Sequence, residues 1–394
     1  MDDDLYKCVH CGFCLSSCPT YIETGLESES PRGRIALMKA VREERIPMTD
    51  KVISHWDSCL QCRACEIACP SGVEFGKLMS GIKSEIVELK IRNKRSKFFR
   101  RVALNPLFSN LILLKATSVL ILIYNILQVK KLVSFLSNLG IVPKSIATLN
   151  SSVPTPQGSP FSAKTEFSTT SKIKVGLLKG CVMPLTEGDA MRSVVSLLKK
   201  NNLQVFIPEL QGCCGALNHH AGEHQTAKML AEKNIEAFLA DDLDYIVIAS
   251  AGCSAATKEY PSLFKKDSDM YSKALEIADK TRDIQELLIE IGLVKPSGVI
   301  DKKVVLQEPC HLINAQKISE EPLKILKMIP GLEVSTLENP NLCCGSAGIY
   351  SIINPEMSKK ITERKMNQIL LENPDIIATC NPGCSMQMKN YLRI

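Results

Sequence analysis

The second half of the chain alternates short apolar runs with longer stretches in which apolar residues recur every three or four positions. Short runs of this kind predict buried strands, and the longer stretches predict amphipathic helices. The first part of this half is predicted to run strand, helix, strand, helix, strand, over residues 174–178, 190–199, 204–207, 223–239 and 245–249. Strands that alternate with helices are typical of a parallel α/β sheet.

The same order returns further along the chain, over residues 304–307, 323–328, 333–337, 356–371 and 375–379. The cysteines repeat with it. From the first cysteine of a copy to its double cysteine there are 32 positions in one copy and 33 in the other, and from there to the last cysteine there are 39 and 40. We therefore interpret residues 173–298 and 299–394 as two copies of one cysteine-rich α/β unit.

Every cysteine of the two copies follows a predicted strand. Because the carboxyl ends of parallel strands share one edge of a sheet, these thiols are expected to converge in each copy. Glycines stand beside them and are expected to permit sharp turns and a close approach of the backbone. These glycines are Gly215, Gly252, Gly345 and Gly383.

The converging thiols are candidate ligands of a further iron–sulfur centre, with a redox-active thiol pair and a structural role as alternatives. The second copy is the stronger candidate, because Cys380 stands where the first copy has Ala249. The thiols of the second copy are Cys310, Cys343, Cys344, Cys380 and Cys384. The weaker candidates are those of the first copy, Cys181, Cys213, Cys214 and Cys253.

Two cysteine runs of one pattern, CxxCxxCxxxCP, occupy residues 8–19 and 59–70. The pattern is the signature of bacterial two-cluster ferredoxins, in which the fourth cysteine of each run binds the other cluster. It predicts two [4Fe-4S] clusters, one held by Cys8, Cys11, Cys14 and Cys69 and the second by Cys18, Cys59, Cys62 and Cys65. Zinc or disulfides are the alternatives, because CxxC alone also suits zinc.

Between the two runs, Ser30 as N-cap and Pro31 at the first helical position predict a helix that ends near Arg45 and packs over the clusters. Its Arg32 and Arg34 are expected either to donate hydrogen bonds to cluster sulfur or to a partner, or to be solvated at the start of the helix. A further helical stretch is expected from Pro70 to about residue 91.

A basic run over residues 92–101 is followed by an apolar stretch over residues 107–129. The uncharged part of that stretch spans only 14 residues, 116–129, whereas a bilayer crossing needs about 20. A helix buried against a partner subunit, or an interfacial helix whose basic flank meets anionic lipid headgroups, explains the pattern better. A helix packed in the core of the chain itself is the remaining alternative.

Residues 150–172 are rich in Ser, Thr and Pro and are interpreted as a linker or a surface loop. The domain prediction is therefore a two-cluster ferredoxin-type domain over residues 1–92, a helical docking segment over 93–149, the linker over 150–172 and the two cysteine-rich repeats. The predicted fold class is α+β, with a mainly helical ferredoxin-like domain before a duplicated α/β domain whose halves contain parallel sheets.

The chain has 394 residues, of which 45% are hydrophobic and 17 are cysteines, and its net charge is +6. An odd number of cysteines at metal-ligand spacings is not a secreted disulfide framework. With no apolar signal core near the N-terminus, these features predict a reducing, cytoplasmic location. The mild charge, without an aromatic-interleaved basic motif, predicts no nucleic-acid partner.

Several blocks together resemble the glycolate oxidase iron–sulfur subunit. They are the run from Cys8 to Cys14, the stretch from Pro31 to Ile35 and the double-cysteine repeats, the second of which reads LCCGSAG over residues 342–348. In that family the subunit joins two FAD-binding subunits of a membrane-associated glycolate dehydrogenase that passes electrons onward to quinone. The resemblance therefore implies FAD on partner subunits only, a quinone or other acceptor, and a peripheral location on the inner face of the cell membrane.

The absence of a GxGxxG turn after a strand agrees with a flavin outside this chain. Relatives of the implied glycolate system act on D-lactate or glycerol 3-phosphate. The repeats also resemble those of heterodisulfide reductase subunits, where the pattern ends in CxxC. This chain departs from that pattern, because its first copy ends in one cysteine and Cys380 and Cys384 of the second are separated by three residues.

Three hypotheses remain open from the sequence. The chain is the electron-transfer subunit of a flavin-dependent hydroxy-acid dehydrogenase, a catalytic thiol or disulfide reductase, or an assembly subunit whose repeats are only scaffold. Six histidines are weaker evidence, because a histidine near such a site is more often structural than catalytic. None is assigned a role: His10, His55, His219, His220, His224 and His311.

Overall fold

The computed structural model describes residues 2–89, 111–143, 146, 150, 153–162 and 172–392. The basic run 92–101, the start of the apolar stretch, and residues 151–152 and 163–171 of the predicted linker lie outside the described residues. The chain divides into two compact units. One contains Met1–Phe99, Leu217–Gln225 and Ser297–Thr379, and the other contains Arg100–Ala216, Thr226–Pro296 and Cys380–Ile394.

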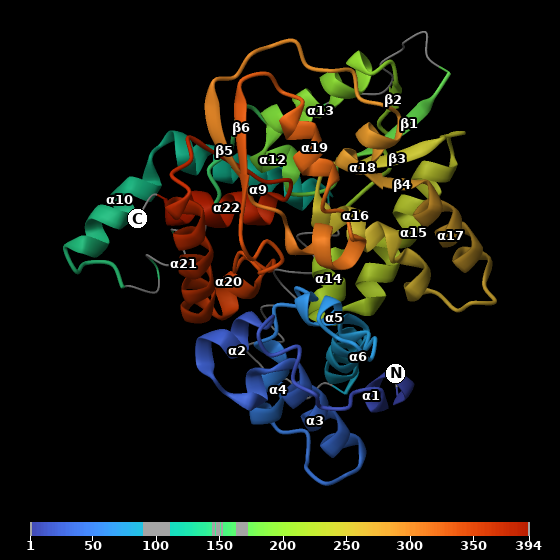
Figure 1. Cartoon of the computed structure of the whole chain (residues 1–394), viewed down its shortest axis with the longest axis vertical. Coiled ribbons are helices and arrows are strands. Elements are labelled where there is room, and N and C mark those ends of the chain that lie inside the picture. Colours follow the sequence, from blue (N-terminus) through green and yellow to red (C-terminus); the bar gives the residue numbers. More distant parts are fainter. Residues whose placement is uncertain are drawn as a thin grey trace. The chain divides into compact units, whose positions relative to one another are not determined.

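The N-terminal part of the first unit is helical, as the sequence predicts (Figure 1, blue). Its helices are α1 (Asp2–Tyr6), α2 (Pro19–Thr24), α3 (Pro31–Arg42), α4 (Asp50–Asp57), α5 (Ala64–Ile67) and α6 (Phe75–Glu88). The centre of its core is formed by four fully buried side chains, Trp56, Leu78, Met79 and Ile86. Two short loops carry the cysteine runs around this core, which also packs against Cys59 and Cys65.

The predicted helix after Ser30 is confirmed as α3. The Ser30 hydroxyl accepts a hydrogen bond from the Gly33 backbone N–H at 3.0 Å, and Pro31 occupies the first turn. Gly33 is required here because a Cβ atom would lie 1.8 Å from the carbonyl oxygen of Glu27. The helix ends at Arg42, slightly before the predicted residue 45.

The second cysteine-rich copy contributes a three-stranded parallel sheet to the same unit, in the order β6-β5-β7. Its strands are β5 (Lys302–Leu306), β6 (Leu332–Thr336) and β7 (Ile376–Ala378). A single turn at His311–Ala315 follows β5, α19 (Glu321–Lys327) leads into β6, and α20 (Tyr350–Ile353) and α21 (Pro355–Leu371) lead into β7. The predicted strands and helices of this copy are confirmed within a few residues of their bounds.

The first copy forms a four-stranded parallel sheet in the other unit, in the order β2-β1-β3-β4. Its strands are β1 (Lys174–Leu178), β2 (Gln204–Phe206), β3 (Tyr245–Ile248) and β4 (Thr281–Asp283). The predicted parallel sheet is confirmed, but the sequence reasoning missed β4. The strand pairs only with β3 at the edge of the sheet. Its three residues, Thr281–Asp283, are polar and do not form the apolar run that marks the other strands.

Helices surround the first-copy sheet. They are α12 (Met183–Thr186), α13 (Gly188–Lys200), α15 (His224–Leu239), α16 (Ala251–Lys258), α17 (Asp269–Lys280) and α18 (Ile284–Glu290). A short helix, α14 (Ala216–Ala221), precedes α15. The last helix of the chain, α22 (Pro382–Tyr391), belongs to this unit by its contacts, although it comes after β7 in sequence.

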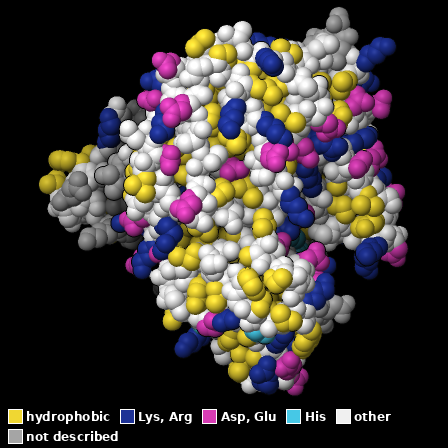
Figure 2. All heavy atoms as spheres, viewed as in Figure 1, with side chains coloured by type: hydrophobic (Ala, Val, Ile, Leu, Met, Phe, Trp, Pro, Cys, Tyr) yellow, Lys and Arg dark blue, Asp and Glu magenta, His cyan; other side chains and the backbone are white. Residues whose placement is uncertain are grey.

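The apolar stretch forms α9 (Leu111–Ile126) and continues as α10 (Val129–Asn138). Large apolar side chains on and after these helices are exposed, among them Leu120 at 65%, Phe135 at 60% and Ile141 at 66%; Figure 2 shows apolar side chains on α10 at its left edge. Within the described residues no single helix is long and apolar enough to cross a bilayer. The segments Val119–Ile126 and Val129–Ser137 meet that test only as a pair, with a bend of 64° between them.

Candidate metal centres

Four thiols of the N-terminal domain surround one small cavity of about 30 Å³: Cys8, Cys11, Cys14 and Cys69. Gly12 turns the loop between them with φ of +90°, and Arg32 holds it by donating from Nη1 to the His10 carbonyl oxygen at 2.9 Å. Burial raises the pKa of the Cys14 thiol, and the neighbouring Cys8 and Cys18 add to the rise. The structure thus brings the fourth cysteine of the second run to the first three of the first run.

The complementary set, Cys18, Cys59, Cys62 and Cys65, is buried. Burial raises the pKa of the Cys65 thiol well above its ordinary range, and the nearby sulfurs of Cys62, Cys59 and Cys18 raise it further. The Gln61 backbone N–H donates to the Cys59 sulfur at 3.3 Å. Both groups therefore have the crossed membership that the two-cluster signature requires, and their assignment as ligands remains a prediction.

The chemistry of these two groups fits cubane clusters. Within the described residues no three Cys, His, Asp or Glu side chains are placed to share a single metal ion. The thiolates of a [4Fe-4S] cluster each bind a different iron, so they need not converge on one point as the four ligands of a structural zinc do. Iron would bind these cysteines as thiolates, so its binding would release their protons.

Arg34 connects the second thiol group to its surroundings. Its side chain is 1% exposed, and Nη1 lies 3.9 Å from the Cys18 sulfur. The guanidinium also donates to Glu29 at 2.7 Å and to the His55 carbonyl oxygen at 2.7 Å. Of the two expectations for this arginine, solvation is wrong, and donation to cluster sulfur stays a prediction that the contact with the Cys18 sulfur favours. His55, to which no role was assigned, pairs through Nδ1 with Glu29.

The second copy places Cys310, Cys343 and Cys344 together in the first unit. Contacts with Cys310 and Cys344, and then burial, raise the pKa of the Cys343 thiol well above its ordinary range. Cys310 is also the strongest neighbour acting on the Cys62 thiol, whose pKa burial raises. Cys380 and Cys384, which complete the predicted set, belong to the other unit.

Side chains of the second copy hold the loop that carries Cys62. Asn314 is 3% exposed and donates from Nδ2 to the Cys62 carbonyl oxygen at 2.8 Å. Leu60, Cys62 and Ala64 form one apolar cluster with Cys343. The ligand loop of the predicted second cluster therefore packs directly on the second-copy thiols, a contact that spacing alone does not indicate.

The first copy gathers its four thiols within the second unit. The Cys181 and Cys213 sulfurs are 3.3 Å apart, and hydrogen bonds link Cys213 to Cys214 and Cys214 to Cys253. The hydrogen bond with Cys214, and then burial, raise the pKa of the Cys253 thiol well above its ordinary range. The predicted convergence of these thiols is therefore present in the structure.

The turns at the double cysteines depend on glycine, as predicted. Gly215 and Gly345 have φ of +81° and +88°, which other residues rarely adopt. The expectation of a sharp turn is wrong for Gly252 and Gly383. Both lie in the first turn of a helix, α16 and α22, because the chain enters a helix directly after the strand. Gly252 instead permits a close approach, since a Cβ atom there would lie 3.3 Å from Asn381 Oδ1.

Sequence reasoning also missed a histidine cluster in the first unit. Ser80 Oγ lies 2.8 Å from Nε2 of His219 and 2.9 Å from Nε2 of His224, and the two imidazole rings stack with centroids 4.6 Å apart. His220 contacts the ring of His311 edge to face at 5.1 Å. Burial, and then the charge of His224, lower the pKa of His219 to about 4, so this pair is neutral at pH 7.

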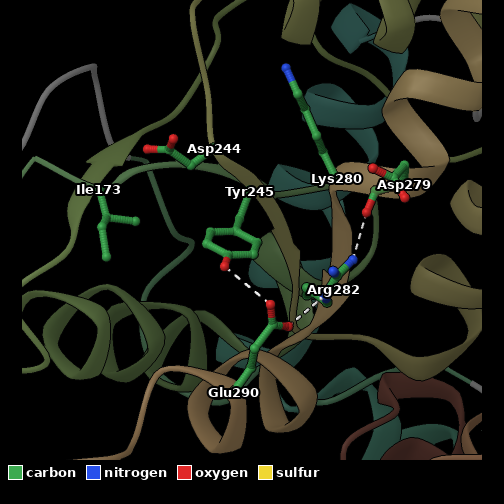
Figure 3. A pocket seen from close by; sticks show the side chains of 7 residues that line it. All are labelled: Ile173, Asp244, Tyr245, Asp279, Lys280, Arg282 and Glu290. Atoms are coloured by element: carbon green, nitrogen blue, oxygen red, sulfur yellow. Dashed lines mark hydrogen bonds and ion pairs between the residues drawn. The ribbon is translucent and has the colours of Figure 1, made fainter.

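A charged pocket of about 380 Å³ lies elsewhere, in the second unit (Figure 3). Glu290 accepts hydrogen bonds from Arg282 at 2.7 Å and from the Tyr245 hydroxyl at 3.1 Å, and Asp244 and Lys280 also line the pocket. Tyr245 begins β3, and Asp244 and Lys280 directly precede β3 and β4. Sites in parallel sheets form at the opposite, carboxyl ends, where the thiols of this copy lie.

Comparison with known proteins finds matches to two family models in this chain. A family model described as a 4Fe-4S dicluster domain matches residues 4–73. A second model, described as a cysteine-rich domain, matches twice, at residues 175–258 and 304–389. The fold and the thiol groups therefore define an iron–sulfur protein that joins a dicluster domain to a duplicated cysteine-rich domain.

Curated relatives extend the likeness to nearly the whole chain. The "Probable glycolate oxidase iron-sulfur subunit" of Bacillus subtilis is 36% identical over 99% of this chain and 89% of its own length. The "Glycolate oxidase iron-sulfur subunit" of Escherichia coli is 31% identical over 98% and 90%. The chain belongs to the family of glycolate oxidase iron–sulfur subunits. "Lactate utilization protein A" of Bacillus velezensis is 28% identical over 56% of this chain and 92% of its own length.

Proposed function

We propose that the chain is the electron-transfer subunit of a flavin-dependent glycolate dehydrogenase. It receives electrons from FAD on partner subunits and passes them through two [4Fe-4S] clusters toward a quinone. The observation that carries this proposal is the crossed grouping of the N-terminal thiols, in which Cys69 joins the first run and Cys18 joins the second. The near full-length likeness to glycolate oxidase iron–sulfur subunits supports the choice of substrate.

The residues of this chain have distinct roles in the relay. A bound [4Fe-4S] cluster accepts and gives one electron at a time, so two of them divide the two electrons of a reduced flavin. Cys8, Cys11, Cys14 and Cys69 hold the first cluster, and Cys18, Cys59, Cys62 and Cys65 hold the second. Arg34 and the Gln61 N–H favour added negative charge by donating to ligand sulfur at the second cluster.

A third iron–sulfur centre at the second-copy thiols extends the relay. Its support is the packing of Cys62 against Cys310 and Cys343. Its candidate ligands within the first unit are Cys310, Cys343 and Cys344. The first-copy thiols are the weaker candidate, although all four lie together.

The apolar helices α9 and α10 dock the complex to the cytoplasmic face of the membrane. Their exposed apolar side chains support an interfacial location. Between Glu88 and Glu166 the sequence has no acidic residue. Side chains of this stretch therefore do not repel the negative charge of an anionic lipid surface.

The experiment is an anaerobic titration of the purified native complex with glycolate, followed by the broad iron–sulfur absorbance near 400 nm. Bleaching that returns when a quinone analogue is added is the expected result. Cys14→Ser, with Ser16→Ala as a neighbouring control, is expected to leave the flavin reducible while stopping electron transfer beyond it. Full dye reduction by a Cys14→Ser complex would contradict the relay.

D-Lactate is the second candidate substrate, because proteins named for lactate utilization match 56% of this chain. Bleaching by D-lactate and not by glycolate would keep the relay and change the substrate. The disulfide reductase alternative is less favoured. Reactive cysteines have lowered pKa values, whereas those of Cys213, Cys253 and Cys343 are raised.

A further inference from the structure

Tyr350 carries a buried hydroxyl group whose function the relay does not yet explain. The residue begins α20 and is 6% exposed. Within the described part of the chain its oxygen has no hydrogen-bond partner. Buried tyrosine hydroxyls normally have one, so this position indicates an acceptor other than the oxygen and nitrogen atoms of the described residues.

The surroundings of Tyr350 place the hydroxyl beside the second thiol group. The ring packs in one apolar cluster with Cys62, Ala64 and Cys343. Burial raises the pKa of the hydroxyl, and among the neighbouring thiols Cys59 acts on it more strongly than Cys343. Cys62, which packs with the ring, and Cys59, which acts more strongly on the hydroxyl, both belong to the set that is predicted to hold the second cluster.

Neighbouring polar groups are already engaged. The charge of Arg34 lowers the pKa of the Tyr350 hydroxyl, against the effect of burial. The guanidinium itself donates hydrogen bonds to Glu29, to Ser58 and to the His55 carbonyl oxygen. Glu29 in turn accepts from Arg34, His55 and Ser58. The thiols of Cys59 and Cys343 also act on the hydroxyl, and sulfur is the acceptor that they offer. Thiolate and sulfide sulfur both accept hydrogen bonds, and such bonds set the reduction potential of a cluster.

We propose that Tyr350 is a positioning residue that donates a hydrogen bond to sulfur of the second cluster and raises its reduction potential above that of the first. The bond stabilises the more negative, reduced form of the cluster, so electrons move toward the second cluster, which lies beside the second-copy thiols. This inference rests on the proposed function, since it requires a cluster held by Cys18, Cys59, Cys62 and Cys65.

The test is a potentiometric titration of the native complex, followed by electron paramagnetic resonance. The signal that is lost in Cys59→Ser identifies the second cluster. Tyr350→Phe keeps the ring and removes the hydroxyl. We expect the reduction equilibrium of the second cluster to move about tenfold toward the oxidised form, which is about 59 mV for a one-electron couple, while the first cluster keeps its potential. Tyr6→Phe, an exposed tyrosine of the same unit, is the matched control.

A second variant covers the case in which Tyr350→Phe fails to assemble. Replacing Tyr350 with 3-fluorotyrosine keeps the shape and makes the hydroxyl a stronger donor, so the potential of the second cluster is expected to rise. A merely structural role would not produce shifts of opposite sign in the two variants.

The outcomes separate this inference from the function on which it rests. If the wild-type complex contains only one cluster signal, the proposed relay fails. If both clusters are present and neither Tyr350 variant moves the potential of the second, or both move it in the same direction, the relay stands and the role of Tyr350 is overturned.

Discussion

The two cysteine-rich copies have one chain pattern and different environments. The first-copy thiols contact one another within their own unit, where Cys181 and Cys213 are 3.3 Å apart. The second-copy thiols pack against the ferredoxin-type domain, where Cys310 acts on Cys62. The two copies therefore carry similar thiols after similar strands. The residues around the two sets of thiols differ.

The support of the double cysteine also differs between the copies. In the first copy Asn234 of α15 accepts from the Gly212 N–H and donates to the Cys213 carbonyl oxygen, both at 2.8 Å. In the second copy Lys365 of α21 donates to the carbonyl oxygens of Asn339 and Pro340 at 3.1 Å. An amide can serve as donor and acceptor, whereas an ammonium group can only donate. Each copy thus needs its own helix to shape its thiol loop.

The largest effect is expected when the first-copy support is removed. Asn234→Ala leaves buried backbone groups of Gly212 and Cys213 without a partner, so it should destabilise the chain by about 3 kcal/mol. Chemical denaturation measures this loss. Glu236→Ala, at an exposed position of the same helix, should change stability little. If Asn234→Ala altered the potential of the second cluster, the contrast between the copies would fail, since the first-copy thiol loop is not expected to influence that site.

The free energy of unfolding should depend on pH with opposite sign in the two units. The larger change is expected in the unit that contains the first-copy sheet. Burial raises the pKa of Asp283 to about 7, although the hydrogen bond from Ser254 opposes the rise; of the nearby charges, Lys258 also opposes it and Glu286 adds to it. A folded pKa above the unfolded one favours folding in acid, and the benefit is lost as pH rises through 7. From pH 5 to pH 8 this group should lower the free energy of unfolding by about 2.5 kcal/mol.

Asp283→Asn tests that expectation, because asparagine keeps the N-cap of α18 but does not titrate. Denaturation midpoints of the variant should fall less than those of the wild type between pH 5 and pH 8. Identical pH profiles for the two proteins would show that Asp283 does not titrate in this range.

The histidine cluster of the first unit should respond with the opposite sign. His219 has a pKa of about 4, below its unfolded value, and it faces Ser80, His220 and His224. The unfolded chain therefore binds more protons, and stability present above about pH 6.5 is lost on acidification. From pH 7 to pH 5 the loss should be about 2 kcal/mol. His219→Gln should flatten this dependence in denaturant titrations, and an unchanged slope would contradict it.

The smallest effect is expected at Asn314, which joins the second copy to the Cys62 loop. Asn314→Ala removes the hydrogen bonds to the carbonyl oxygens of Cys62 and Asn341, at a cost of about 1.5 kcal/mol. Hydrogen exchange should rise over residues 59–65 and stay unchanged around Cys213. Equal protection of residues 59–65 in wild type and variant would show that the second copy does not brace the ligand loop.

The chain pattern predicted the strands of both copies, the N-cap at Ser30 and the left-handed glycines Gly215 and Gly345. Each is a local property, since short apolar runs, capping side chains and turn geometry involve neighbouring residues. β4 escaped prediction because a three-residue edge strand has no pattern of its own. The helical environment of Gly252 and Gly383 was mispredicted, because the conformation directly after a strand depends on how the next segment packs.

Sequence by itself therefore determined which thiols exist, their spacing and the crossed pairing that the two-cluster signature implies. Tertiary structure alone decided which groups surround them. Arg34 reaches Cys18 across 16 positions, Asn314 reaches Cys62 across 252, and Tyr350 packs with Cys62 while its hydroxyl has no hydrogen-bond partner among the described residues. No local pattern records such contacts, because they form only when distant segments fold onto one core and exclude water between them.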